Sequence, residues 1–304
     1  MKKIVLAGTA MLCTFAAPLA QARTLDPAKP EDAVEIAKRA QCGAADGKPA
    51  IYRWSAKVYS RVNGEPDRLL FTGEGMNVRQ CTTVTDAKRG KGYRQVSREL
   101  MVFTDAKTGE IVRNWTNPWT GETVEVMQIA NDPVNVPTIF PYSADGKPFN
   151  PGYSRMGQWL AMPMEIPLFY HNVLAGDYQD YVGGKYHAME IFDFMARADE
   201  ILDTKYPTAY PSISWVRVSD WMPWMKMRGR DGIMIFNAVG TKVDRIADLP
   251  KVLQDEIATS YPDYATPPPA DDTRPNETTW TVFKKWVEGR KAAAGAELNP
   301  HKAH

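Results

Sequence analysis

Alternating apolar and polar residues fill the first half of the chain. Val, Tyr, Trp, Phe and Thr are enriched in five runs that short polar turns separate, which is typical of strands in hairpins. Connections this short leave no room for crossover helices, so the pattern predicts an antiparallel meander. Gly73 and Gly75 lie within the second run and indicate a bulge or a bend. The five predicted strands are residues 51–62, 69–84, 93–104, 110–116 and 122–130.

The second half of the chain begins with an irregular stretch. Residues 131–157 hold five prolines among Asn and Gly, which is typical of a long functional or mobile connection. Apolar and aromatic runs then return, and an aromatic, Met-rich piece at residues 221–227 lies between the last two. The runs predict four more strands, at residues 159–170, 185–198, 212–221 and 232–239.

Helical spacing of apolar residues appears only toward the two ends of the chain. It predicts helices at residues 31–41, 249–257 and 279–293. We therefore predict a mainly β protein, either a single large antiparallel β-barrel or a strongly curved sheet, with short N-terminal and C-terminal helices. A barrel of about eight to ten strands has room for side chains and one small ligand, as in lipocalins.

The N-terminus, residues 1–22, is predicted to be a signal peptide. Lys2 and Lys3 precede an apolar stretch at residues 4–19, and the triplet Ala-Gln-Ala that follows fits a signal-peptidase site. A membrane anchor would need ~20 uninterrupted apolar residues, and this stretch is shorter and broken. We expect a periplasmic or secreted protein that begins near Arg23 and has no membrane span after cleavage.

The rest of the chain is predicted to be one β-rich domain at residues 23–295. Its C-terminal helices begin at about residue 248, and residues 296–304 are expected to be a disordered tail. Removal of the signal peptide takes away two lysines and changes the formal net charge from +1 to −1. This balance implies neither a nucleic-acid partner nor an anionic membrane surface.

Two cysteines, Cys42 and Cys81, remain after cleavage. In an oxidising compartment they form either a disulfide or two buried thiols, and their spacing leaves both open. Neither lies in a CxxC motif, which excludes a zinc or iron–sulfur site built from thiolates. His171 and His187 form no HxH or HxxxH motif, and no Walker or GxSxG sequence occurs. We therefore expect no metal and no cofactor.

One segment, residues 97–135, is dense in residue types that bind ligands. It reads SRELMVFTDAKTGEIVRNWTNPWTGETVEVMQIANDPVN. Three other stretches accompany it: MEIPLFYHN at 164–172, YHAMEIFDF at 186–194, and WMPWMKMRGRDG with IMIFNAVGTK at 221–242. Together they resemble a bacterial family known as domain of unknown function 1838, over most of the mature chain. The family's name records an unassigned function, so the resemblance implies no catalytic residue.

Four residues are candidates for proton transfer. Arg98 and Glu99 point to opposite faces of one predicted strand, so at most one faces inward, and the pair is alternatively a surface salt bridge. An inward arginine is costly unless it binds an anion. His187 is a candidate general base because histidine titrates near neutral pH, although it equally fits a hydrogen-bonded core histidine. Tyr170 is a candidate proton donor.

Nine residues are candidates for substrate binding. Some lie in two turns expected at the barrel mouth, where they either line a pocket rim or only close hairpins. Others form an aromatic group around Arg217, which either holds the anionic end of a flat ligand or packs as core. The set is Asn117, Trp119, Asn131, Asp132, His171, Glu190, Trp215, Arg217 and Trp224.

These candidates support two functions. One is a cofactor-independent acid–base enzyme, a lyase or isomerase, that acts on a small aromatic hydrophobic compound, with carbon–carbon cleavage by a quinone-methide or retro-aldol route. The other is a periplasmic carrier of a hydrophobic ligand, which needs the same pocket without a paired proton donor and acceptor. A scaffold with a filled core is a third possibility and predicts no cavity of ligand size.

Overall fold

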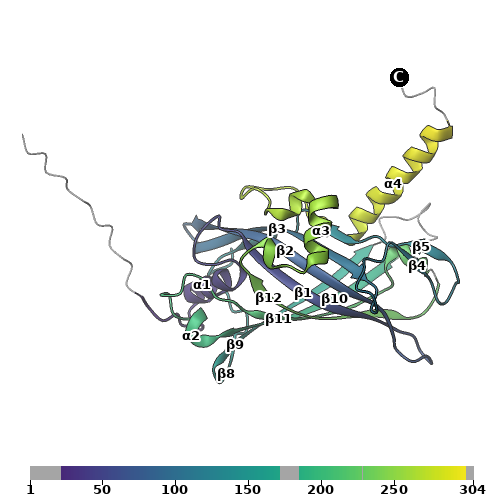
Figure 1. Cartoon of the computed structure of the whole chain (residues 1–304). Coiled ribbons are helices and arrows are strands. Elements are labelled where there is room, and N and C mark those ends of the chain that lie inside the picture. The colour runs from purple at the N-terminus through teal and green to yellow at the C-terminus, as the bar shows by residue number, and fades with distance from the viewer. Residues whose placement is uncertain (1–21, 172–184, 228, 299–304) are drawn as a thin grey trace, which may run out of the picture.

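The computed structural model describes residues 22–171, 185–227 and 229–298, and its largest feature is one antiparallel sheet (Figure 1). The strands of this sheet are β1 (Ala50–Arg61), β2 (Arg68–Asp86), β3 (Gly90–Thr104), β6 (Ile129–Asn131), β7 (Val136–Ile139), β8 (Ser154–Met156), β9 (Trp159–His171), β10 (Lys185–Arg197), β11 (Ser212–Ser219) and β12 (Ile233–Val243). Nine follow the order β6-β3-β2-β1-β12-β11-β10-β9-β8, and β7 also pairs with β3 to make ten. The long strands confirm the runs that alternation predicts.

The predicted fourth strand does not continue the sheet, and of the predicted fifth strand only residues 129–130 do so, as part of β6 beside β3. They are shorter than expected, and β4 (Asn114–Thr116) and β5 (Thr123–Glu125) form a separate two-stranded hairpin. A side chain occupies the place beside β3 that a fourth strand would take, because the Gln128 Oε1 accepts a hydrogen bond of 2.7 Å from the Phe103 amide. Residues 110–113 therefore contribute only an isolated bridge, between Thr104 and Ile111.

The sheet is open, so of the two predicted architectures the closed β-barrel is wrong. In the described residues no pairing joins β8, at one edge, to β6 or β7 at the other. A later segment, residues 262–278, which we call the strap, lies beside the loop between β6 and β7 instead. The Glu277 amide donates to the Pro133 carbonyl at 2.8 Å, and the Asn276 side chain pairs with the Asn135 backbone. The strap thus satisfies backbone groups of the loop beside this edge of the sheet.

The open sheet still curls strongly. Side chains of β3 and of β10 line one cavity, although four strands separate these two in the sheet. Antiparallel register places alternate residues on the concave face, and this face carries the largest apolar core. Its members include Tyr52, Trp54, Phe103, Phe236 and Trp215.

The opposite face of β2 and β3 has its own core. Helix α3 (Lys251–Ser260) lies over these strands (Figure 1). Leu253 and Ile257, one turn apart on α3, pack against Met76 and Leu100. Burial of each such side chain stabilises the fold by about 1.5–3 kcal/mol.

Helices are less confined to the ends than we predicted. Helix α1 (Pro30–Gln41) and helix α4 (Thr279–Leu298) do lie near the termini, and α4 extends past residue 295, where we predicted the domain to end. However, α2 (Ala198–Ile201) follows β10 directly, and a 3-10 turn η1 (Pro223–Met225) lies between β11 and β12. Pieces of three or four residues are too short to show helical periodicity, which is why the sequence pattern misses them.

A disulfide joins Cys42, at the end of α1, to Cys81 on β2. Of the two alternatives that the cysteine spacing left open, the structure therefore shows a disulfide and not two buried thiols. The bridge closes a loop of 39 residues and fixes α1 to the sheet. In the described part of the chain, no helix has both the length and the apolar character that crossing a membrane requires.

Gly75 is needed because a neighbouring side chain packs against it, and not because the strand forms a bulge there. The pairing of β2 with β3 is continuous through Gly73 and Gly75, and the irregularity in β2 lies instead opposite Val58 and Tyr59. A Cβ atom at Gly75 would lie 2.2 Å from the indole ring of Trp54. The glycine therefore makes room for this tryptophan, which lines the cavity described below.

We predict that Gly75→Ala lowers the free energy of unfolding by about 1–3 kcal/mol, because the new methyl group overlaps the Trp54 ring. Gly289→Ala on α4 is the matched control, since nothing lies within 4 Å of a Cβ at that position. It should be neutral or stabilising by up to about 1 kcal/mol. Urea unfolding of the two variants measures both effects, and equal stability of both would contradict the packing argument.

Candidate functional site

A cavity of about 180 Å³ lies in the curl of the sheet. Residues of β1, β2 and β3 line one side and residues of β9, β10 and β11 the other. Much of its wall is aromatic and comes from concave-face positions of these strands. The aromatic lining residues are Tyr52, Trp54, Tyr93, Phe192, Phe194 and Trp215.

Polar and charged side chains also reach the cavity. They come from three different strands and from the end of α1, so the fold brings them together from distant sequence positions. Convergent polar groups in an otherwise apolar concavity are typical of a ligand site. These lining residues are Gln41, Asn77, Arg79, Gln95, Ser97, Glu99 and Glu190.

An ion pair between Glu190 and Arg217 lies at one end of the cavity. The two residues face each other across the β10–β11 ladder, and the Arg217 Nη1 is 2.9 Å from the Glu190 Oε1. The Arg217 Nη2 donates a second hydrogen bond, of 2.9 Å, to the Tyr186 hydroxyl. Burial opposes the positive charge, but Tyr186, Glu190 and Glu99 outweigh it and raise the pKa of Arg217, so the guanidinium stays charged.

Glu99 faces this ion pair from β3. Burial and the negative charge of Glu190 raise the pKa of Glu99 to about 7, while Arg217 and Arg79 act in the opposite direction. A carboxyl group with this pKa exists in both protonation states at neutral pH, which suits a general acid or base. Of the predicted pair Arg98 and Glu99, the glutamate is therefore the residue that faces inward.

Asn131 is the neighbour of Glu99 on the adjacent strand. The two residues are paired in the β3–β6 ladder and so share the concave side. Asn131 is 8% exposed, and its Oδ1 has no hydrogen-bond partner among the described residues. A buried acceptor without a partner is rare in folded proteins. The Asn131 Oδ1 is therefore a candidate to accept a hydrogen bond from a ligand.

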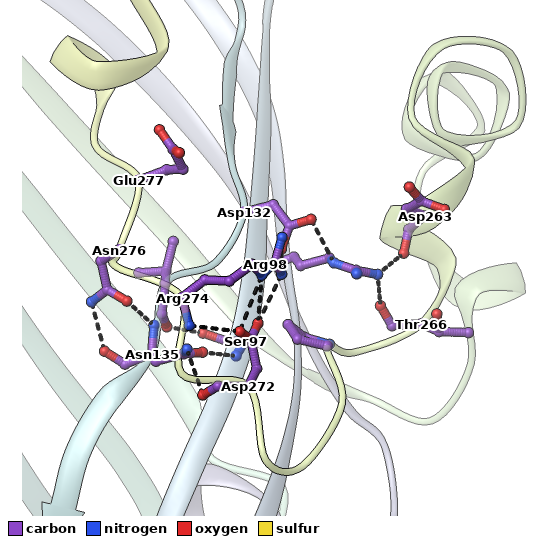
Figure 2. Close-up of polar contacts among 12 residues, drawn as sticks. Ser97, Arg98, Asp132, Asn135, Asp263, Thr266, Asp272, Arg274, Asn276 and Glu277 are labelled. Atoms are coloured by element: carbon purple, nitrogen blue, oxygen red, sulfur yellow. Dashed lines mark hydrogen bonds and ion pairs between the residues drawn. The ribbon is translucent and has the colours of Figure 1, made fainter.

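Arg98 lies on the other face of β3, in a polar network with the strap (Figure 2). Its Nε forms an ion pair of 3.0 Å with Asp132, and its Nη1 donates to the carbonyls of Asp263 and Thr266. Arg274 binds the other oxygen of Asp132 at 2.8 Å. The proton-transfer and substrate-binding roles predicted for Arg98 and Asp132 would need access to the cavity, and the structure places both residues outside it.

The polar network around Arg98 and Asp132 nevertheless supports part of the cavity wall. Val134 and Val136 line the cavity and belong to the segment that follows Asp132. The Ser97 hydroxyl binds the Val134 carbonyl, and the Asn135 amide nitrogen donates to the Asn276 Oδ1 at 2.7 Å (Figure 2). The strap therefore holds from outside the loop that forms this part of the wall.

Three predicted binding residues lie in a different aromatic cluster. Asn117 is fully buried, and its side chain binds the Met225 carbonyl and the Trp119 amide, which fixes the turn. The Trp119 indole packs on Trp221 with the ring centroids 5.0 Å apart. Trp224 is 1% exposed among Phe71, Phe103 and Trp115. These three side chains stabilise the fold and do not line the cavity.

His187 lies on the outer face of β10. Its side chain is 57% exposed, and its Nδ1 is 3.1 Å from the Asp220 Oδ2. The concave face of β10 instead presents Tyr186, Glu190 and Phe192, so the structure does not bring His187 to the cavity. The side chains of Tyr170 and His171 lie outside the described residues. No group of three or more metal-binding residues that fits a metal ion occurs in the described part of the chain.

Comparison with known proteins assigns the family. The model of the family described as "Protein of unknown function (DUF1838)" matches residues 47–287. The chain belongs to the DUF1838 family. The match covers every strand of the large sheet and the first part of α4. No curated protein and no solved structure matches the chain.

In this DUF1838 protein, sequence reasoning found the lining residues Glu99, Glu190 and Trp215, together with Arg217, which binds Glu190, and missed the Arg79 side of the cavity. The sequence did contain an indication of this side of the cavity, because alternation along β2 puts Asn77 and Arg79 on the same face as Gly73 and Gly75. Tyr52 and Trp54 face the cavity from the neighbouring strand by the same rule.

We predict a pH-dependent contribution of Glu99 to stability. The pKa of Glu99 is about 7 in the folded state and near 4.5 when unfolded, so the folded protein binds this proton more tightly. The contribution is fully present below pH 4.5 and is lost as the pH rises through 7. Relative to Glu99→Gln, the wild type should therefore lose about 3 kcal/mol of unfolding free energy between pH 4.5 and 8.

Urea unfolding of both proteins across this pH range measures the difference. Glu165→Gln is the matched control, because Glu165 is exposed on the outer face of β9. It should keep the pH dependence of the wild type. Parallel curves for the wild type and Glu99→Gln would show that Glu99 titrates in the folded protein as it does in water.

Proposed function

We propose that this protein is an acid–base enzyme of lyase or isomerase type that acts on a small aromatic compound, with Glu99 as the proton-transferring group. The observation that carries the proposal is the position of Glu99, a carboxyl group with a pKa of about 7 that faces Glu190 and Arg217 in an aromatic-lined cavity. Proton transfer by one positioned group contributes typically 10²–10⁴-fold to a rate.

The neighbours of Glu99 have complementary roles in the proposal. Arg217 stabilises the ionised form of Glu99 and any negative charge that develops on the substrate, because its buried guanidinium stays positively charged. Glu190 and Tyr186 hold the guanidinium in place through bonds of 2.9 Å each. The aromatic walls bind the flat body of the substrate.

Carbon–carbon cleavage by a retro-aldol route fits these groups. In this step Glu99 accepts the proton of a substrate hydroxyl, and the electron pair of that O–H bond forms a carbonyl group. The bond to the neighbouring carbon breaks, and its electron pair passes into a conjugated acceptor such as a quinone methide, which becomes a phenolate. The proton on Glu99 then returns to the product, so no oxidant or other co-reactant is consumed.

A carrier is the second candidate, because aromatic walls alone also bind a hydrophobic ligand. The discriminating feature is the charged end of the cavity. A carrier has no use for a carboxyl group poised near neutral pH, and burial of three charged side chains there costs stability. We therefore place the enzyme first.

We predict that Glu99→Gln reduces turnover at least 100-fold, because glutamine keeps the shape of the side chain and cannot accept the proton. The protein is incubated with single-ring compounds that carry a hydroxylated side chain, and products are followed by proton NMR. Glu165→Gln should retain wild-type turnover. Compounds that bind equally to the wild type and Glu99→Gln without conversion by either would establish the carrier instead.

We also propose that the protein works in the periplasm or outside the cell. The signal-peptide pattern of residues 1–22 and the disulfide between Cys42 and Cys81 support this, since disulfides persist in oxidising compartments. Expression of the full chain in a bacterial host should give a periplasmic protein whose first residue lies near Arg23. N-terminal sequencing of the periplasmic fraction measures this, and a cytoplasmic chain that begins at Met1 would contradict it.

A further inference from the structure

Arg79 is a buried cation with only neutral hydrogen-bond partners. It lies on the concave face of β2, is 9% exposed and lines the cavity. Its Nε donates to the Asn77 Oδ1 at 2.7 Å, and its Nη1 donates to the Gln41 Oε1. The guanidinium also lies 4.8 Å from the centre of the Tyr52 ring.

No carboxylate in the described part of the chain forms an ion pair with Arg79. The other inward arginine, Arg217, differs in this respect because Glu190 balances its charge. Burial of a charge without a countercharge is costly, and the planar guanidinium of an arginine in such a place is suited to binding a carboxylate from a ligand. Burial lowers the pKa of Arg79, which reflects the same cost, whereas Glu99 acts in the opposite direction from a distance.

Two further basic side chains, Lys242 and Arg39, lie near Arg79. The Lys242 amine is held by the carbonyls of Arg39 and Ala209, and Arg39 itself binds carbonyls of residues 200–203. Burial and the nearby charges of Arg79 and Arg39 lower the pKa of Lys242 to about 7, so this amine is only partly charged at neutral pH. Of these three basic side chains, Arg79 is the one that lines the cavity.

The size of the cavity limits what binds there. Its volume is about 180 Å³, and a dry protein cavity of roughly 150 Å³ holds one benzene molecule. A single ring with small substituents therefore fits, whereas a fused or two-ring compound needs more room. The flat walls formed by Trp54, Trp215 and Phe192 suit such a ring.

We propose that the cavity binds a single-ring aromatic compound through its anionic substituent, and that Arg79 is the residue that binds this substituent. A carboxylate matches the fork of the guanidinium, and its charge balances the one that Asn77 and Gln41 leave uncompensated. This rests on the proposed function in that both use the same cavity, and it assigns to Arg79 the role that the sequence suggested for Arg217.

The geometry also orients the ligand. Asn77 is the register partner of Glu99, and Arg79 is the next residue on the same face of β2. Diagonal neighbours of this kind have Cβ atoms about 7–8 Å apart, which is comparable to the length of a substituted ring. A compound bound to Arg79 therefore presents its other substituents to Glu99 and Arg217, where the proton transfer is proposed.

The test compares benzoate with benzamide, which has the same shape without the charge. Titration calorimetry on the wild type should show benzoate binding at least 10-fold tighter than benzamide. In Arg79→Met the benzoate affinity should fall at least 10-fold, and the benzamide affinity should change less than 3-fold. Arg53→Met is the matched control, because Arg53 is on the outer face of β1, and it should bind both compounds as the wild type does.

The wild-type comparison needs no variant, so the inference stays testable if Arg79→Met fails to fold. Equal affinities for benzoate and benzamide, or unchanged benzoate binding by a folded Arg79→Met, would overturn it. Glu99→Gln separates this inference from the proposed function. If Glu99→Gln still turns over substrate but benzoate binding requires Arg79, only the proposed function is refuted. If Glu99→Gln is inactive but the wild type shows no preference for benzoate over benzamide, only the inference about Arg79 is refuted.

Discussion

Charged side chains held away from water are the constraint on which the rest of this structure depends. Glu99, Glu190, Arg79 and Arg217 all point into the curl of one sheet, where isolated charges are strongly disfavoured. Glu190 and Arg217 balance each other at 2.9 Å, whereas Glu99 lowers its cost by holding a proton near neutral pH. Arg79 is left with neutral partners. The site therefore contains one balanced pair, one group ready to exchange a proton and one cation available to a ligand.

The fold meets this constraint by supporting the cavity from outside. The strap and the network around Arg98 and Asp132 hold the loop that carries Val134, and α3 covers the outer face of β2 and β3. The disulfide at Cys42 fixes the end of α1, from which Gln41 reaches Arg79. Catalytic and binding geometry must be held within a fraction of an ångström, so these outer contacts matter for the site although they never touch a ligand.

Alternation made most of the sheet predictable from the sequence. It predicts the long strands, and it places Glu99 on the same face as Tyr93, Gln95 and Ser97, although only the structure shows that this face is the inward one. Whether the sheet closes into a barrel was not predictable, since it depends on whether its two edge strands pair. His187 was a candidate general base or core histidine, and the local pattern did not show that its ring lies on the outer face of β10.

The convergence of the cavity charges, and the part played by Arg79, escaped prediction for a related reason. Register within one hairpin is local, but the meeting of Glu99 on β3 with Glu190 and Arg217 depends on how far the whole sheet curls. Arg79 looked like one more charged residue in a long strand, and only the cavity shows that it has no carboxylate partner. Long-range curvature is set by the sum of strand twist and packing, which a single sequence does not reveal.

The most direct test of the central claim is the pKa of Glu99 in the folded protein. Carbon-13 NMR of glutamate side-chain carboxyl groups, titrated from pH 4 to 9 in the wild type and in Glu99→Gln, assigns the resonance that disappears in the variant. The account predicts that this carboxyl group titrates with a midpoint of about 7. A midpoint near the ordinary value of 4.5 would contradict it, because Glu99 would then carry a permanent charge at neutral pH and could not serve as the proton-transferring group.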